Sequence, residues 1–553
     1  DLRITSTKVK NLAGKPTTFA REATGLVREV SPVSIGIWNI ASSGPLAIGL
    51  AYTLAFWLSN YPRVDLPFVC IVTIALTFCF SGAAALVASA MPRSGGDYVF
   101  VGRIIHPAVG FTSSWNMFIY NTITGQGTFV GYIAYYALGP MFYTIGAMLG
   151  NPSLIQMGEA TLTLPWSFII ILVLVLGYGA ILMFGLKTSI RLTVVCVVLG
   201  WICLLVGLVS LATISQADFI ARFNQYAFAI SGKEDAYHYI IDAARGFGYS
   251  TETQPYSYAM QDVLGLAGLV SMAVSWNWMH IYFSGEIKRA GEPSRQLLMI
   301  SIPLVSMLFA YAFSAWLLLQ VAGGDFLNAY NYLSVNQPDA LPFYVTAGGY
   351  VNFLLAMAAP NVFVATIINL SMLFSGLGIM FCFYFTTRIL FAWSFDRVMP
   401  GWLSDINERL HTPVKATIIF IIMSLIGGII NAFWPELLLP LFAAAGSGSA
   451  IFTWIPLCIT AIIFPFVRKD IFEAAPLRRL KLGSIPLVSV MGLIGLVYVS
   501  YIAYSFWMAT TDIGRWTIIA VSAIGFIVFY IAKYYRKSQG IDLGLIFKQI
   551  PPE

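Results

Sequence analysis

Charged side chains are scarce in this chain. Asp, Glu, Lys and Arg make up 10% of its 553 residues and apolar residues make up 58%, whereas soluble globular proteins carry about 25% charged residues. So few charges cannot cover a soluble fold of this length, whose surface has to be hydrated. The composition therefore predicts an integral membrane protein and excludes a multidomain soluble one.

Long apolar runs without charged residues recur along the chain, and each is long enough to cross about 30 Å of hydrocarbon. The runs do not alternate as a barrel strand would, so we expect an all-α fold of about twelve membrane helices. The first half has predicted spans at Val33–Leu58, Leu66–Ala90, Val109–Leu138, Trp166–Leu186, Leu192–Ala212 and Leu266–Phe283. The second half has predicted spans at Leu297–Val321, Val362–Trp393, Ala416–Phe433, Leu438–Phe464, Ile485–Phe506 and Trp516–Ala532.

The net charge of +6 does not indicate a nucleic-acid partner, because the basic residues are unevenly placed. If the odd-numbered loops face outward, five of the 31 Lys and Arg residues lie outside, namely Arg63, Arg222, Lys233, Arg245 and Arg515. This excess on the inside follows the positive-inside rule. We expect a multi-pass protein of the cell membrane with both termini in the cytoplasm. Residues 1–30 hold no apolar stretch, so no cleaved signal peptide is expected.

Motifs for catalysis are also missing. The chain has no HExxH, no GxSxG nucleophile elbow and no phosphate-binding loop, so hydrolysis and ATP-driven pumping are not indicated. Its six cysteines lie singly in apolar runs, and we expect them to be buried as small apolar residues. We predict no enzyme, no metal site and no cofactor.

Two long segments between spans are expected on the outside, at Thr213–Gly265 and Gly323–Asn361. The first is rich in Tyr, Asp and Arg, and it forms either an ordered cap over an entrance or a solvated loop. The second contains a short apolar stretch at Val351–Ala358.

The segment Asn39–Pro45, near the middle of the first span, predicts a break in the helix. Pro45 removes a backbone donor, and the Ser-Ser-Gly before it loosens the helix further. An unwound segment would point free N–H groups and the positive end of a helix dipole into the membrane centre, which suits a carboxylate. The alternative is a proline kink packed against neighbouring helices.

Polar side chains mark three other spans. Asn121, Thr124 and Thr128 are spaced i, i+3, i+7 and share a face of the third span that must meet protein or water. Ser371 and Ser375 lie one turn apart in the eighth span, and Gly446–Ser449 is a patch of small residues in the tenth. Such residues more often serve close helix packing than ligand contact.

His280 is the main ionisable residue within a predicted span, where such residues are costly and rare. With Trp276, Asn277 and Trp278 it forms a polar and aromatic cluster in the sixth span. The cluster either lines a pocket for a solute or carries a proton, or else His280 is a neutral histidine that hydrogen-bonds a neighbouring helix.

Three segments between the spans resemble signature motifs of the amino acid, polyamine and organocation transporter superfamily. The first is Met91–Trp115, which reads MPRSGGDYVFVGRIIHPAVGFTSSW. The second is Ser284–Lys288 followed by Pro293–Arg295, similar to GE-x-K-N-P and the arginine after it. The third, similar to SR-x-L...RDG...P...TP, consists of Thr387–Leu390, Asp396–Arg397, Met399–Pro400 and Thr412–Pro413. With Gly25–Leu26 before the first span, the match covers nearly the whole chain in the expected order.

The resemblance implies two inverted five-helix repeats, with a solute bound between broken helices one and six. The chain would then divide into a cytoplasmic segment (1–32), a first repeat (33–212), an extracellular loop (213–265), a second repeat (266–464), two additional spans (485–532) and a cytoplasmic tail (533–553).

Matched by position, the G-S-G of the family's first helix falls on Ser42–Gly44. The resemblance implies that the backbone N–H groups of Ser42, Ser43 and Gly44 bind the substrate carboxylate. It also implies that carbonyl groups at Ile40 and Ser275 bind the substrate amine, with a gating position at Met272. The side chains of Asn121, Trp276, Asn277 and Trp278 complete the candidate substrate site.

The sequence departs from the family where many members have G-F-E in helix six and this chain has Trp276–Trp278. Without that acidic residue a polycation would lack a counter-charge, so a neutral amino acid, apolar or aromatic, fits better.

The fifth span also lacks the lysine of some proton-coupled relatives. We therefore expect coupling to a proton at His280 or to sodium at Ser371 and Ser375.

The resemblance predicts a secondary transporter of amino acids that works by alternating access, with ion coupling or exchange. A non-transporting solute sensor or an accessory subunit on the same fold is the alternative, and its own tryptophans would fill the pocket. A membrane enzyme is disfavoured, since titratable groups are not clustered. The expected partners are a small amino acid and the lipid bilayer, and the sequence leaves open a homo-oligomer or a membrane complex.

Overall fold

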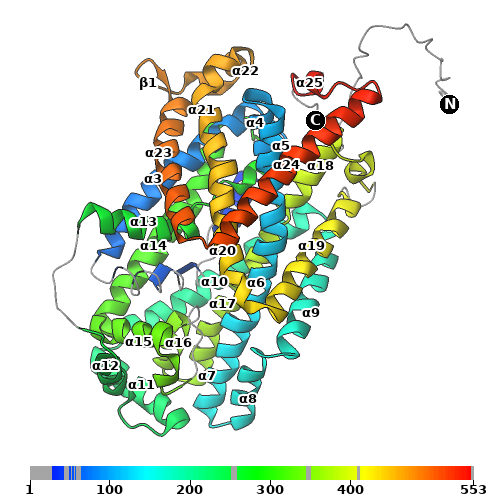
Figure 1. The fold of residues 1–553 in the computed structure, drawn as a ribbon. Coiled ribbons are helices and arrows are strands. Elements are labelled where there is room, and N and C mark those ends of the chain that lie inside the picture. The colour runs from blue at the N-terminus through cyan, green and yellow to red at the C-terminus, as the bar shows by residue number, and fades with distance from the viewer. Residues whose placement is uncertain are drawn as a thin grey trace.

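The computed structural model describes residues 26, 28–42, 49–50, 53–54, 57, 61, 64–250, 258–343, 350–407 and 412–549, which form a bundle of helices (Figure 1). In the first half the α-helices are α1 (Pro32–Ser42), α3 (Leu66–Ala90), α4 (Asp97–Ile104), α5 (Pro107–Ile119), α6 (Gly127–Tyr132), α7 (Gly139–Leu149), α8 (Pro152–Ala160), α9 (Trp166–Leu182), α10 (Leu186–Ala212), α11 (Gln216–Ser231), α12 (Ala236–Gly246) and α13 (Met260–Val274). In the second half they are α14 (Pro293–Val321), α15 (Gly324–Asn336), α16 (Tyr350–Met357), α17 (Val362–Cys382), α18 (Phe385–Phe395), α19 (Val414–Phe433), α20 (Leu438–Ser449), α21 (Ile455–Val467), α22 (Lys469–Ala474), α23 (Leu487–Ala509), α24 (Asp512–Ser538) and α25 (Leu543–Ile546).

Short elements of other kinds interrupt or join these helices. The π-helices are η1 (Tyr120–Gln126), η2 (Ile133–Leu138) and η8 (Ala450–Trp454). The 3₁₀ turns are η3 (Met279–Tyr282), η4 (Ser284–Glu286), η5 (Pro338–Ala340), η6 (Gly401–Ser404), η7 (Pro435–Leu437) and η9 (Pro476–Arg479). A small antiparallel hairpin pairs β1 (Lys481–Leu482) with β2 (Ile485–Pro486), in the register Lys481 to Pro486 and Leu482 to Ile485.

The predicted all-α membrane fold is confirmed. In the described part of the chain, eight helices are long and apolar enough to cross a membrane: Leu66–Ala90, Leu186–Ala212, Pro293–Val321, Val362–Phe395, Val414–Phe433, Pro440–Val467, Leu487–Met508 and Asp512–Ser538. The apolar helices at Trp166–Leu182 and Met260–Ser271 are shorter. The span predicted at Val33–Leu58 lies only partly within the described residues, where α1 covers its first part.

The third span is longer than predicted. It was expected to end at Leu138, but α7 continues the helical path to Leu149. Proline lacks a backbone donor and usually kinks or ends a helix when it lies in the interior. In the structure Pro140 lies in the first turn of α7, directly after the π-helix η2. A wider π turn is one of the ways by which a helix accommodates such a local irregularity.

The described parts of the two long segments between spans are largely helical. The helices α11 and α12 lie in the first, and α15 and α16 lie in the second, at the end of the bundle opposite α4, α18 and α25 (Figure 1). Tyr237 of α12 stacks on Phe326 of α15 with ring centroids 4.3 Å apart, and its hydroxyl donates to the carbonyl of Ala322 at 2.8 Å. The described part of Thr213–Gly265 is thus packed rather than solvated. Its role as a cap over an entrance stays a prediction.

Small residues let the helices of the third and ninth spans touch through their backbones. A Cβ added to Gly427 of α19 would collide with the carbonyl of Ile123, and one added to Gly127 would collide with the backbone of Gly427. Close approach of this kind is how helices associate in membranes, where lipid offers little hydrophobic driving force.

We predict that Gly427→Ala lowers thermal stability, because neither backbone can move away from the new methyl group. Overpacking costs about 1–3 kcal/mol. The measurement is the thermal midpoint of the detergent-solubilised protein. Gly177→Ala is the matched control, since a Cβ there meets nothing within 4 Å. Equal midpoints for both variants would contradict the contact.

Candidate functional site

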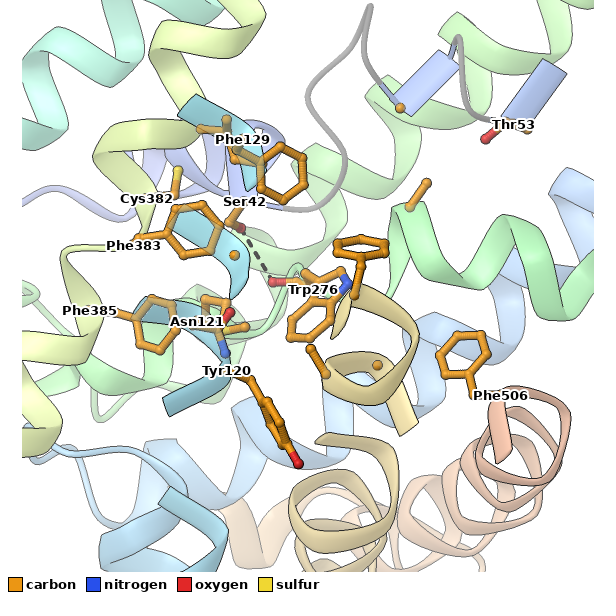
Figure 2. A pocket seen from close by; sticks show the side chains of 18 of the residues that line it. Ser42, Thr53, Tyr120, Asn121, Phe129, Trp276, Cys382, Phe383, Phe385 and Phe506 are labelled. Atoms are coloured by element: carbon orange, nitrogen blue, oxygen red, sulfur yellow. Dashed lines mark hydrogen bonds between the residues drawn. The ribbon is translucent and has the colours of Figure 1, made fainter. Parts of the chain in front are cut away.

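A cavity of about 100 Å³ lies between α1, the sixth span, η1 and the α17–α18 region. Its size is comparable with the roughly 150 Å³ cavity that admits benzene in an engineered protein. Figure 2 shows its wall: the polar side chains of Ser42 and Asn121 point toward Trp276, and aromatic rings surround them. The cavity can therefore hold a small solute with one polar and one apolar part.

The sixth span is broken beside this cavity. α13 ends at Val274, residues 275–278 form turns, and the chain continues in the 3₁₀ turns η3 and η4. Irregular backbone at membrane depth is tolerated only where protein or a cavity surrounds it. The predicted break in helix six is thus present, although Trp276 stands where the family has glycine.

The break contacts the end of α1 directly. The Ser42 hydroxyl lies 3.3 Å from the carbonyl oxygen of Trp276 and 3.0 Å from that of Asn39 (Figure 2). A hydroxyl has one proton, so it donates to one of these carbonyls at a time. Ser42 thereby connects helix one to helix six at the cavity wall.

Asn121 enters the cavity from an irregular segment of the third span. The π-helix η1 carries Tyr120, Asn121 and Gly125 into the wall. The amide nitrogen of Asn121 donates to the carbonyl of Met117 at 2.8 Å. The Tyr120 hydroxyl has no hydrogen-bond partner among the described residues. π-Bulges of this kind occur frequently at functional sites.

Aromatic residues form most of the remaining wall, and the sequence did not indicate them. Phe383 and Phe385 lie at a turn that interrupts the eighth span between α17 and α18, and Phe129 lies near them (Figure 2). Phe506 of α23 lies on another side of the cavity (Figure 2). No clear signal in the sequence indicated this turn, because the glycine-rich apolar run before Tyr384 and Phe385 has the pattern of a continuous helix.

Three of the expected site residues lie in the break but outside the cavity wall. Ser275 is buried, with its hydroxyl 3.3 Å from that of Tyr498 and 3.4 Å from that of Thr77. The side-chain oxygen of Asn277 accepts from the Ser81 hydroxyl. The buried Trp278 packs edge to face on Phe80, with ring centroids 5.9 Å apart. Of the segment 275–278, the side chain that faces the cavity is that of Trp276.

His280 is fully buried and has a partner on each ring nitrogen. Nδ1 lies 3.0 Å from the amide nitrogen of Asn39, and Nε2 lies 2.9 Å from the side-chain oxygen of Gln296. An amide nitrogen donates and an amide oxygen accepts, so the pattern fits a neutral ring protonated at Nε2. These are the contacts expected of a histidine that joins neighbouring helices.

Ser371 and Ser375 lie on α17 where it packs on α10. The Ser371 hydroxyl donates to the carbonyl of Ile368 at 2.7 Å. A Cβ added to Gly200 of α10 would lie 3.7 Å from both the Ser371 carbonyl oxygen and the Ser375 hydroxyl. The described contacts are those of close helix packing.

Some expected site residues are not described. Ser43 and Gly44 lie outside the described residues, and so does the predicted break of helix one at these positions. Met272 lies in α13, but its side chain is not described. Ile40 is buried in α1.

The residues that line the cavity carry no formal charge. Among the described residues, no group of three or more His, Cys, Asp and Glu side chains is arranged to hold a metal ion. The cavity wall thus offers polar groups and aromatic faces to a ligand.

Charges gather instead at the end of the bundle where α4, α18 and α25 lie (Figure 1). The Glu286 carboxylate forms a two-pronged ion pair with Arg388, both contacts at 2.8 Å, and Arg103 pairs with Asp396 at 2.8 Å. All four side chains are buried. The pair Glu286–Arg388 thus joins the end of the sixth span to the eighth span.

Residues 39–529 match the family described as amino acid permease. The chain belongs to this family. It is therefore a multi-pass membrane protein that transports amino acids, and the resemblance to the amino acid, polyamine and organocation superfamily is confirmed. Curated proteins give no match to the chain.

We predict that Tyr498→Phe raises the KM for the transported amino acid about fivefold, because one net hydrogen bond is worth about 1 kcal/mol. The Tyr498 hydroxyl lies 2.9 Å from that of Thr77 and positions the break through Ser275. Uptake kinetics in reconstituted vesicles measure the effect. Tyr504→Phe on the same helix, 63% exposed, is the control. An unchanged KM in Tyr498→Phe would exclude this positioning role.

Proposed function

We propose that this permease carries neutral amino acids with apolar or aromatic side chains across the cell membrane by alternating access. The observation that carries the proposal is the uncharged, largely aromatic cavity at the break in helix six. A cationic side chain in it would lose its hydration without gaining a counter-charge, and an anionic one would meet no basic residue in the wall.

The two ends of a zwitterion need polar partners. The Trp276 carbonyl and the Ser42 and Asn121 side chains supply acceptors and donors at one part of the cavity wall. We propose that the backbone N–H groups of Ser43 and Gly44, which follow Ser42 in the sequence, bind the substrate carboxylate. The apolar side chain would then contact Phe129, Phe383 and other rings.

The open cavity favours a transporter over a sensor or accessory subunit. A non-transporting relative would be expected to fill the space between helices one and six with its own tryptophans. Here Trp276 forms one wall, and Trp278 packs away on Phe80. Among the described residues, neither of these tryptophans fills the cavity beside Ser42, which supports a transporter.

Two further proposals rest on the sequence: the orientation of the chain in the membrane and the ion that drives transport. We propose that both termini lie in the cytoplasm, which places the Glu286–Arg388 pair on that side and the packed helices α11 and α15 outside. A proton or sodium ion, or exchange, would drive transport. The hydrogen bonds of His280 favour a neutral structural histidine.

The experiment is uptake of labelled amino acids into vesicles reconstituted with the purified protein. We expect leucine and phenylalanine to be taken up and lysine and glutamate to be excluded. Imposed proton and sodium gradients identify the coupling ion. Uptake of lysine at the rate of leucine would contradict the proposed selectivity, and absence of uptake for every neutral amino acid would favour the sensor.

Narrowing the cavity should act on large substrates first. We predict that Ala273→Leu, in the cavity wall, reduces phenylalanine uptake about fivefold or more relative to alanine uptake, since overpacking by a few methyl groups costs about 1–3 kcal/mol. The ratio of the two uptake rates is the readout. Ala180→Leu, on the exposed face of α9, is the control. An equal loss of uptake for phenylalanine and alanine would contradict the proposal that this cavity holds the side chain of the substrate.

A further inference from the structure

Asp97 is a buried carboxylate that the transport site does not use. It begins α4, directly after the MPRSGG segment, at the end of the bundle where Glu286 pairs with Arg388. Its relative exposure is 0%. A carboxylate removed from water is costly unless a cation pairs with it.

Asp97 is held by hydroxyl groups rather than by a cation. One carboxylate oxygen accepts from the hydroxyl of Tyr282, which is the last residue of η3. The other accepts from the hydroxyl of Ser113 in α5. Two backbone contacts join the same segments. The N–H of Gly95 donates to the carbonyl of Tyr282 at 3.2 Å, and Ser94 forms an antiparallel bridge with Phe283. We call Ser94, Gly95, Asp97, Ser113 and Tyr282 the latch.

Neighbouring charges do not neutralise Asp97. The titratable groups on the elements packed against it are Tyr98 and Arg103 of α4, His106 at the start of α5, His280 and Tyr282 of η3, Glu286 of η4, Arg388 of α18 and Cys458 of α21. Arg103 and Arg388 form their ion pairs with Asp396 and Glu286. In this set, the Tyr282 hydroxyl donates to the Asp97 carboxylate from another element, and the backbone N–H of Tyr98 donates to it from α4 itself.

We propose that Asp97 binds a proton while the latch is closed and releases it when the sixth span moves away and water reaches the carboxylate. The inference rests on the proposed function, because alternating access requires this end of the bundle to open. When the proton binds, one carboxylate oxygen becomes a donor, and one of the two hydroxyls accepts from it instead of donating. No covalent bond other than that to the proton is made or broken. Asp97 thereby makes opening of this end dependent on pH.

The direction of the dependence follows from burial. Desolvation raises the pKa of Asp97 to about 6, and the hydrogen bonds from Ser113 and Tyr282 oppose that rise. A hydrated Asp has a pKa near 3.9. Because the closed latch binds the proton more tightly, low pH favours the closed form. The ratio of closed to open latch should fall about tenfold between pH 5 and pH 7.

The experiment measures the distance between spin labels at Lys288→Cys and Gly401→Cys in the full chain, from pH 5 to pH 7.5. Lys288 is exposed beside the sixth span, and a Cβ at Gly401 meets nothing within 4 Å. We expect the population at the short distance to fall as pH rises. Asp97→Asn should abolish this response, because the amide does not titrate.

A second variant, Ser113→Ala, tests the proposal independently in case Asp97→Asn does not fold. Ser113→Ala removes a bond that lowers the pKa of Asp97, so the midpoint of the response should move to higher pH. Asp470→Asn, at an exposed carboxylate, should leave it unchanged. A wild-type pH response in Asp97→Asn, or an unmoved midpoint in Ser113→Ala, would overturn the proposal. If the response holds while vesicles take up no amino acid, the latch stands and the proposed function fails.

Discussion

Every peptide group in the membrane must find its hydrogen bond within the protein, because lipid supplies none. Regular helices meet this demand alone, so each departure from helix needs shelter from lipid. Three of the described departures border the cavity: the π-helix η1, the turn at 275–278 of the sixth span and the turn at 383–384 of the eighth. Each contributes residues to the cavity wall, whereas the π-helices η2 and η8 contribute none. Much of the irregular backbone thus surrounds the cavity.

The same constraint determines where charges lie. A wall without charge suits a substrate whose own charges are satisfied by backbone groups, and the charged side chains are left to the ends of the bundle. There Glu286 and Arg388 pair in full burial, as do Arg103 and Asp396. In the described structure, Asp97 is buried at the same end without a cation beside it and accepts from the hydroxyls of Ser113 and Tyr282, which is why the proposed pH response is assigned to it.

Much of the fold could be predicted from the sequence, because span length and apolarity follow directly from membrane thickness. The span at Leu66–Ala90 has the predicted bounds, and the break at Trp276 follows the motif order even though the glycine is lost. The ends of the helices were harder to predict than their number and type. α10 begins at Leu186 rather than Leu192 because Lys187 and Arg191, read as loop residues, lie on a helix that continues beyond the apolar run.

The site was less predictable than the fold. Ser42, Asn121 and Trp276 lie in the cavity wall, but Ser275, Asn277 and Trp278 make contacts behind it. In a 3₁₀ and turn segment the helical spacing of 100° per residue no longer tells which side chain faces the solute. The aromatic wall was invisible for another reason: with 40 Phe residues in the chain, rings that face lipid and rings that face the cavity look alike in sequence.

The claim on which all of this depends is that the cavity at the break of helix six is where the amino acid binds. A cryo-electron microscopy map of the protein in nanodiscs with saturating leucine tests it most directly. We expect ligand density between Ser42, Asn121 and Trp276, with the side chain of the ligand directed to Phe129 and Phe383. Density at another place in the bundle, with this cavity empty, would contradict it.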